Sequence, residues 1–216
     1  MTGATTGDGS GGTTVDRLIE LIAVFLLGVA TVGTAWCGLQ GARWNSESSS
    51  QAQLASDQHV EGSRLFGLAT QRVGYDSSSI AQYAQAQAAG NEKLLAFYRQ
   101  TLIRPELRPF LQRWEAQVRR GQPPVNPVSD PTYLADQLRP YQAAVAAAAE
   151  ADQASQRASD NASAYVAVTI LLAAALFFAG VMSGFRFRAA RVLLLVAALA
   201  TMALAATQLA DLPVLL

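Results

Sequence analysis

His59 is the one histidine of the chain, and acids flank it in the run ASDQHVEGS. A histidine near two carboxylates has the composition of a metal site or of a general base. On a helix, Asp57 and Glu61 are four residues apart and share a face, whereas His59 is two residues from each and points elsewhere. No Glu-x-x-His pattern supplies further ligands from other helices. The spacing therefore favours a solvated helix surface over a metal site or a general base.

The other acids and the one cysteine also lack the spacing of a reactive centre. Glu150 and Asp152 are two residues apart, which puts them on different faces of a helix. Because Cys37 is the one cysteine of the sequence, a disulfide within the chain is excluded. Its place beside Trp36 in an apolar run favours a buried thiol over a reactive or lipidated one. The chain holds no nucleophile elbow, phosphate loop or dinucleotide fingerprint. We therefore expect no catalytic, cofactor-binding or metal-binding residues and a protein that is not an enzyme.

The number and the position of the charged residues argue against a nucleic-acid partner and against ion transport. Sixteen Lys and Arg residues match sixteen Asp and Glu residues, so the formal net charge is zero. Nucleic-acid surfaces need clustered positive charge opposite the phosphates. Inside the apolar runs of the chain Glu20 is the only charge, whereas ion-coupled transporters bury ionisable residues in the middle of the membrane.

The apolar residues, which make up 51% of the 216-residue chain, are concentrated in two blocks. They occupy residues 18–39 and 164–210, and a short basic loop divides the second block. Because a hydrocarbon layer about 30 Å thick needs roughly 20 apolar residues per helix, the blocks predict three membrane spans. The expected segments are a first span at 15–44, an extramembrane domain at 45–162, a second span at 163–182, a basic loop at 183–191 and a third span at 192–210.

The two ends of the chain lie outside these spans. Residues 1–14, mostly Gly and Thr, have almost no apolar mass and predict a disordered tail. Residues 211–216 form a second short tail. The long first apolar run and the acids near its start, Asp8, Asp16 and Glu20, favour an uncleaved anchor over a signal peptide.

Small residues in the first span form two ridges of a helix. Three residues spaced four apart make each ridge: Ala30, Thr34 and Gly38 on one, and Gly33, Cys37 and Gly41 on the other. Such spacing lets another helix approach closely in lipid. All of these residues except Ala30 are candidate helix-packing residues. The pattern leaves open whether the partner helix belongs to the same chain or to a second copy.

Two tryptophans, Trp36 and Trp44, suit the membrane–water interface, where an indole keeps its N–H near the headgroups. No proline lies between Leu39 and Val73, so we expect the first span to continue as the same helix past Trp44. The run from Gly74 to Ser77 then indicates a helix end, with Asp76 or Ser77 capping the next helix.

Prolines divide the rest of the extramembrane domain. The loop at residues 121–131 has four prolines and cannot be helical, whereas no helix breaker lies between Pro140 and Gly180. The last helix should therefore lead directly into the second span. The expected helices are 45–73, 77–103, 105–120 and 131–162. Because they alternate in direction, the predicted fold is all-α: an integral membrane protein with three transmembrane helices and an extramembrane up-down-up-down bundle between the first and second spans.

The loop SGFRFRAAR fixes the expected orientation. Its three arginines are the strongest basic bias near any span end and, with the two tryptophans, are the candidate interfacial anchors: Arg186, Arg188 and Arg191. Positive loops stay in the cytoplasm. We therefore expect the amino terminus and residues 183–191 in the cytoplasm of a bacterial cell and residues 45–162 outside its plasma membrane.

Several longer motifs carry a resemblance. TAWCGLQGARW fits the pattern T-A-W-x-x-x-Q-x-x-R-W, and FYRQTLIRPELRPFLQRW, PVNPVSDPTY, ASDNASAYV and LFFAG follow later in the chain. From Leu21 onward the sequence resembles a family of uncharacterised bacterial three-span membrane proteins. The resemblance implies the same topology and a helical extramembrane domain, and it implies no activity. Within these motifs, Arg104, Glu106 and Arg108 are expected to hold the short helix by ion pairs, with ligand binding as the less favoured alternative.

These patterns favour a non-enzymatic scaffold or accessory subunit in the cell membrane. Its partners would be the lipid bilayer and either further copies of itself or a larger membrane complex. The alternative is a homo-oligomeric channel or efflux component, whose pore would be lined by Thr31, Thr34 or Thr169. An enzyme acting at the outer leaflet is less favoured, since no acid, base and nucleophile converge.

Overall fold

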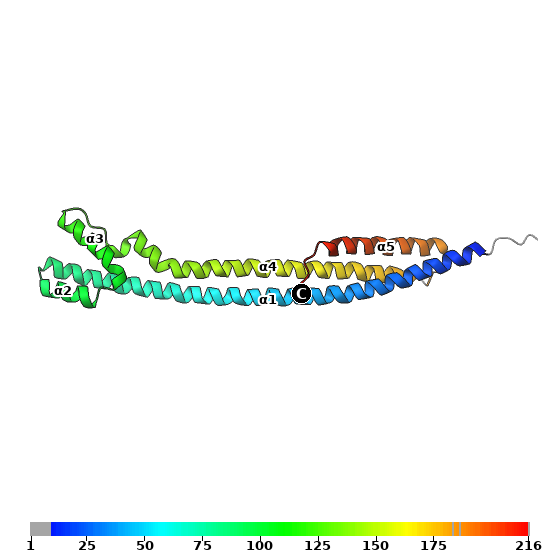
Figure 1. Cartoon of the computed structure of the whole chain (residues 1–216), viewed down its shortest axis with the longest axis horizontal. Helices are drawn as coiled ribbons and strands as arrows, with labels where there is room; N and C mark the ends of the chain where they lie inside the picture. The colour runs from blue at the N-terminus through cyan, green and yellow to red at the C-terminus, as the bar shows by residue number, and fades with distance from the viewer. Residues whose placement is uncertain (1–9, 183, 186, 216) are drawn as a thin grey trace, which may run out of the picture. The chain divides into compact units, whose positions relative to one another are not determined.

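The computed structural model describes residues 10–182, 184–185 and 187–215. Every regular element among them is helical (Figure 1), so the all-α prediction is confirmed. The five α-helices are α1 (Ser10–Ala88), α2 (Glu92–Thr101), α3 (Arg108–Arg119), α4 (Pro131–Met182) and α5 (Arg188–Ala210). Two short 3-10 helices, η1 (Pro105–Leu107) and η2 (Pro127–Ser129), precede α3 and α4.

Three of these helices are long and apolar enough to cross a membrane, as the sequence predicts. The most apolar windows of α1, α4 and α5 have mean hydropathies of 2.2, 2.4 and 2.2. Only 17%, 33% and 17% of the residues in these windows are buried inside the chain. Most of the apolar surface of the three helices therefore lies against no other part of the described chain.

The first long helix continues past Trp44 without a break, as expected from the absence of proline. The predicted helix end at Gly74–Ser77 is wrong, because α1 runs on to Ala88. Gly74 does not take a positive φ, and a helical glycine costs only about 1 kcal/mol relative to alanine. The chain reverses instead at Gly90, whose φ of 65° favours glycine. The Asn91 side chain then caps α2 by accepting from the Leu94 N–H at 3.1 Å.

Two further boundaries differ from the sequence analysis. The expected helix 77–103 is the end of α1 followed by the 10-residue α2, so the intermediate helices are far shorter than the two long ones. The predicted tail at residues 1–14 overlaps α1, which begins at Ser10; residues 1–9 lie outside the described residues. The last turns of α1 pack against later elements through Ile80, Tyr83 and Ala86. The composition of the segment itself does not indicate these contacts.

Contacts within the chain divide it into two compact units. The first unit comprises Met1–Gln51 with Gln153–Leu216, and the second unit comprises Ala52–Asp152. Helices α1 and α4 each contribute to both units.

In the first unit, α4 runs antiparallel to α1, with α5 packed beside them (Figure 1). Two contacts show this direction. A Cβ at Gly33 would meet Leu172. Further along α1, the Ser48 hydroxyl lies 3.3 Å from the hydroxyl of Ser155, which comes earlier in α4. Two clusters of buried apolar residues, one including Leu26, Ala179, Leu195 and Ala198 and the other Cys37, Val168, Leu172 and Ala205, fill the space between the three helices.

In the second unit, α1 and α4 again pack closely through small residues. A Cβ at Gly62 would lie 3.7 Å from the Cβ of Ala144, and Ala148 is fully buried. The principal core gathers where α2, η1 and α3 meet these helices, and it contains Ile80, Tyr83, Leu95, Ile103, Leu107, Leu111 and Tyr133. Phe110 and Trp114 of α3 pack against it, as the 3–4 spacing of that helix predicts.

Candidate functional site

Three of the candidate packing residues face α4 of the same chain. A Cβ at Gly33 would lie 3.1 Å from Leu172 Cδ1, and one at Gly41 would lie 3.6 Å from Tyr165 Cβ. Cys37, between them on the same ridge, is 1% exposed and belongs to the cluster around Tyr165 and Leu172. This ridge therefore brings α1 and α4 together, and the thiol is buried.

The neighbouring ridge is not closed in the same way. Ala30 is fully buried, and the Thr34 hydroxyl donates to the Ala30 carbonyl at 2.8 Å. A Cβ added at Gly38 would meet nothing within 4 Å. The described residues thus leave the Gly38 end of this ridge open, whereas the Gly33–Cys37–Gly41 ridge is filled.

The second tryptophan of the first span binds the carboxyl-terminal segment. Trp36 is 43% exposed, but the indole N–H of Trp44 donates to the Pro213 carbonyl at 3.0 Å. Tyr165 of α4 donates to the same carbonyl at 3.1 Å. Trp44 therefore has a partner within the chain that its position in the sequence does not indicate.

Gln40 completes this clamp, defined here as Gln40, Arg43, Trp44 and Tyr165. Its fully buried side chain donates to the Leu215 carbonyl at 3.2 Å and accepts from the Leu215 N–H at 3.1 Å. Arg43 also donates to the Leu215 carbonyl, at 2.7 Å. The clamp holds the main chain after α5 against α1 and α4. Its three members from α1, Gln40, Arg43 and Trp44, are the Q, the R and the final W of the pattern T-A-W-x-x-x-Q-x-x-R-W.

The structure describes two of the three arginines that are candidate interfacial anchors. Arg188 is the first residue of α5, and Arg191 follows within its first turn. Arg186 lies outside the described residues. The arginines that are described thus stand at the beginning of the third apolar helix.

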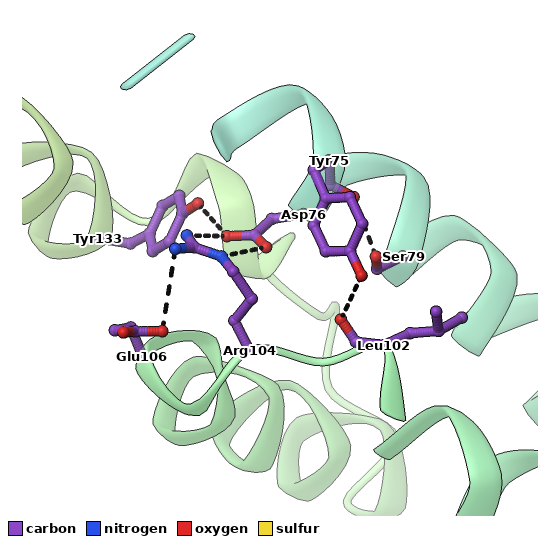
Figure 2. A network of polar contacts seen from close by, with 7 residues as sticks. All are labelled: Tyr75, Asp76, Ser79, Leu102, Arg104, Glu106 and Tyr133. Atoms are coloured by element: carbon purple, nitrogen blue, oxygen red, sulfur yellow. Dashed lines mark hydrogen bonds and ion pairs between the residues drawn. The ribbon is translucent and has the colours of Figure 1, made fainter. Parts of the chain in front are cut away.

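A buried ion pair lies in the second unit, where α1, η1 and α4 meet (Figure 2). Asp76 of α1 is fully buried and accepts two hydrogen bonds from Arg104, at 2.9 Å to Oδ1 and 2.6 Å to Oδ2. The Tyr133 hydroxyl of α4 donates to Oδ2 at 2.5 Å. A bidentate guanidinium and a third donor satisfy the carboxylate, as a buried charge requires. We call these three residues the Asp76 network.

The Asp76 network raises the pKa values of its tyrosine and its arginine. Burial raises the pKa of Tyr133 well above the ordinary value, and the neighbouring Asp76 raises it further. Its hydrogen bond to Asp76 raises the pKa of the Arg104 guanidinium. At neutral pH the tyrosine is therefore a neutral donor and the arginine a permanent cation.

Two expectations about this region need correction or refinement. Asp76 was expected to cap a helix, but it lies within α1 and binds Arg104 from the connection after α2. Arg104 does approach Glu106, with Nη1 and Oε2 3.9 Å apart, but its close partner is Asp76. The close ion pair of Arg104 therefore joins the η1 region to α1, and the pair within the η1 region is the longer one.

A second polar network joins α1, α2 and α3. Glu115 of α3 accepts hydrogen bonds from the Tyr83 hydroxyl and from Arg99, the latter at 2.6 Å. Arg99 also donates to the Tyr83 oxygen at 2.6 Å. Burial, followed by the hydrogen bond to Glu115, raises the pKa of Tyr83. This cluster fixes the two short helices to the end of α1.

The histidine region has the solvated character that its spacing indicates. His59 Nε2 lies 3.3 Å from Asp152 Oδ2, and both side chains are more than half exposed. Glu61 pairs instead with Arg64, which lowers the pKa of Glu61. Within the part of the chain that the structure describes, no group of three or more His, Cys, Asp or Glu side chains is placed to hold a metal ion.

Comparison of the chain with protein-family models, curated proteins and solved structures gives no match. The resemblance to three-span bacterial membrane proteins therefore stays a prediction from the motifs.

Proposed function

We propose that the protein is a membrane-anchored scaffold or accessory subunit that presents its second unit outside the bilayer for oligomerisation or partner binding. The observation that carries the proposal is the exposed apolar surface on all three long helices. Large apolar side chains that are more than half exposed include Leu21, Val24, Phe25 and Val32 of α1, Val166, Ile170 and Phe177 of α4, and Leu193 and Val196 of α5. Such a surface is unfavourable in water and suits lipid.

The polar side chains of these helices support insertion in lipid. The hydroxyls of Thr31, Thr34 and Thr169 donate to the carbonyl four residues earlier, at 2.7, 2.8 and 2.9 Å. A hydroxyl bonded to its own helix needs no water and is tolerated in hydrocarbon. This bonding does not favour the channel alternative, in which the same threonines would line a wet pore.

The lengths of α1 and α4 support a domain outside the bilayer. At about 1.5 Å per residue, the 79 residues of α1 span roughly 120 Å and the 52 residues of α4 roughly 80 Å. A hydrocarbon layer of about 30 Å accounts for only part of either helix. The remainder carries the polar residues from Asn45 onward in α1 and as far as Ser163 in α4.

The basic residues at the start of α5 support the proposed orientation. Because positive loops stay in the cytoplasm, residues 183–191 and the beginning of α1 would lie inside, and residues 45–162 outside the plasma membrane of a bacterium. The open Gly38 end of its ridge leaves room on α1 for a helix of a second copy or of a larger membrane complex.

Cysteine labelling in intact cells tests the orientation. In a Cys37→Ala background, the variants Ser48→Cys and Ser129→Cys are expected to react with an impermeant maleimide added outside. The Ser183→Cys variant is expected to react only after the membrane is opened. Labelling of Ser183→Cys from outside, with Ser129→Cys protected, would reverse the proposed orientation.

Gentle extraction from the native membrane tests the scaffold role. Mass measurement of the extracted protein is expected to give a homo-oligomer or a complex with other membrane proteins. A lone monomer at every protein concentration would contradict the proposal. Conductance of the purified oligomer in planar bilayers would support the channel alternative instead.

A further inference from the structure

A polar cleft of about 320 Å³ opens in the second unit beside the Asp76 network. Four elements line it, and the residues that matter for its chemistry are Arg72 of α1, Arg104 and Glu106 of the η1 region, Phe110 of α3, and Tyr133 and Asp136 of α4. The volume is at the lower end of the range of about 300–1,000 Å³ found for ligand pockets, so it fits a small solute.

The Asp76 network fixes one side of the cleft. Arg104 and Tyr133 line the cleft while both donate to Asp76, and Figure 2 shows the two side chains converging on this carboxylate. Because Tyr133 is 1% exposed and Asp76 fully buried, these groups cannot easily change conformation. The cleft is therefore preformed and requires little ordering when a solute enters.

Arg72 brings an uncommitted positive charge to the cleft. It precedes Asp76 by four residues, one turn of α1, and makes no hydrogen bond or ion pair with any described residue. A guanidinium offers five N–H donors in a planar arrangement that matches a carboxylate. The cleft thus holds a ready donor group for an acidic function of a ligand.

The acids of the cleft limit which ligand is suitable. Glu106 is 62% exposed, and its nearest cation is Arg104, at a distance of 3.9 Å that is too long for a hydrogen bond. Asp136 also lines the cleft, and it is hydrogen-bonded to Arg139. A simple anion near Arg72 would meet these carboxylates, and a simple cation near Glu106 would meet the two arginines. A ligand that carries both charges would satisfy both sides.

We infer that the cleft binds a small zwitterion of the amino-acid type. Its carboxylate pairs with Arg72, its ammonium group pairs with Glu106, and Phe110 forms an apolar wall beside it. This site goes beyond the scaffold role, which assigns no small-molecule ligand to the second unit.

Binding to the full chain in detergent tests the inference. The probes are glycine, alanine, serine and glutamate, with acetate and methylammonium as single-charge controls, and the readout is isothermal titration calorimetry. At least one amino acid is expected to bind about tenfold or more tightly than either single-charge probe, because both charges must be satisfied. The inference is overturned if none of the four binds, or if acetate binds as tightly as the best of them.

Matched variants locate the binding to the cleft. Arg72→Met and Glu106→Gln are each expected to weaken binding of the best probe by about tenfold or more, the loss typical of one charged hydrogen-bonded partner. Neither should lower the unfolding temperature of the unliganded protein, since Arg72 lacks a partner among the described residues and Glu106 has only a distant one. Arg120→Met, outside the cleft, should leave binding unchanged. Unchanged binding in Arg72→Met would also overturn the inference.

Discussion

The two units of the molecule are stabilised by different interactions. In the first unit, helices meet through small residues such as Gly33 and Gly41, and the buried Gln40 bonds to main chain. In the second unit, side chains bond to side chains, as in the Asp76 network and in the cluster around Glu115. Neither Arg104 nor Arg99 is fully buried, so each can keep part of its contact with water.

This difference matches the solvent that each unit would meet. In lipid, apolar helices gain little by hiding apolar surface from one another, so close packing of small residues holds them together. In water, apolar burial drives packing, and a buried carboxylate is tolerated when its hydrogen bonds are complete. The two units should therefore fail under different substitutions.

The largest effect is expected from breaking the Asp76 network. Asp76→Ala removes the carboxylate and leaves Arg104 and the buried Tyr133 hydroxyl without their close partner. Losing one partner of a fully buried pair typically costs about 3–5 kcal/mol, and because Arg104 is partly exposed we expect a loss at the lower end, about 3 kcal/mol. Hydrogen exchange of peptides from residues 52–152 measures this loss. Asp152→Ala, which removes the exposed partner of His59, is the matched control and should leave the exchange unchanged. Equal effects of the two substitutions would mean that the network does not stabilise the unit.

A smaller effect is expected from a pair of glycines in α1. A leucine at Gly33 would collide with Leu172, so Gly33→Leu should destabilise the first unit by about 1–3 kcal/mol. A Cβ at Gly38 would meet nothing within 4 Å in the described chain, so Gly38→Leu should leave the monomer fold intact. Unfolding of the detergent-solubilised protein by added SDS, followed by circular dichroism, measures both. If Gly38→Leu alone is destabilising in the monomer, the assigned packing face of α1 is wrong.

Two glycines of the second unit should respond to alanine with opposite signs. Gly90 has a φ of 65°, where a side chain costs about 1–2 kcal/mol, so Gly90→Ala should destabilise the unit. Gly74 is helical and open, so Gly74→Ala should stabilise it by up to about 1 kcal/mol. Thermal unfolding of the two variants measures the difference. Stabilisation by Gly90→Ala would indicate that the helix does not end there.

The smallest effect is the pH dependence of the second unit. The folded protein keeps Tyr133 neutral because its pKa is raised, whereas an unfolded tyrosine ionises near about pH 10. The unfolded state therefore releases this proton first, so the stabilisation is fully present below pH of about 10 and is lost as the pH rises further. Urea unfolding between neutral and alkaline pH measures the trend. Tyr133→Phe should weaken this alkaline loss, and an identical loss in the variant would exclude Tyr133 as its source.

The long helices were predictable, but the residues that hold the two units together were not. Apolar runs and the absence of proline past Trp44 are local features, so the three apolar helices and the continuity of α1 followed from them. A glycine indicates a turn only if it takes a positive φ, and nothing local distinguishes Gly74 from Gly90. Asp76 and Arg104 are separated by 28 positions and Gln40 and Leu215 by 175, so no periodic pattern reveals that they are partners.

The central claim is that α1 leaves the apolar layer as one unbroken helix. Spin labels at Val32 and Ser50, both exposed and on either side of Trp44, stand five helical turns apart on the same face of α1. In a Cys37→Ala background reconstituted in lipid nanodiscs, pulsed electron resonance should give a single narrow distance of about 27 Å, from roughly 1.5 Å per residue. A markedly shorter distance, or a broad distribution, would show that the helix bends where the apolar residues end.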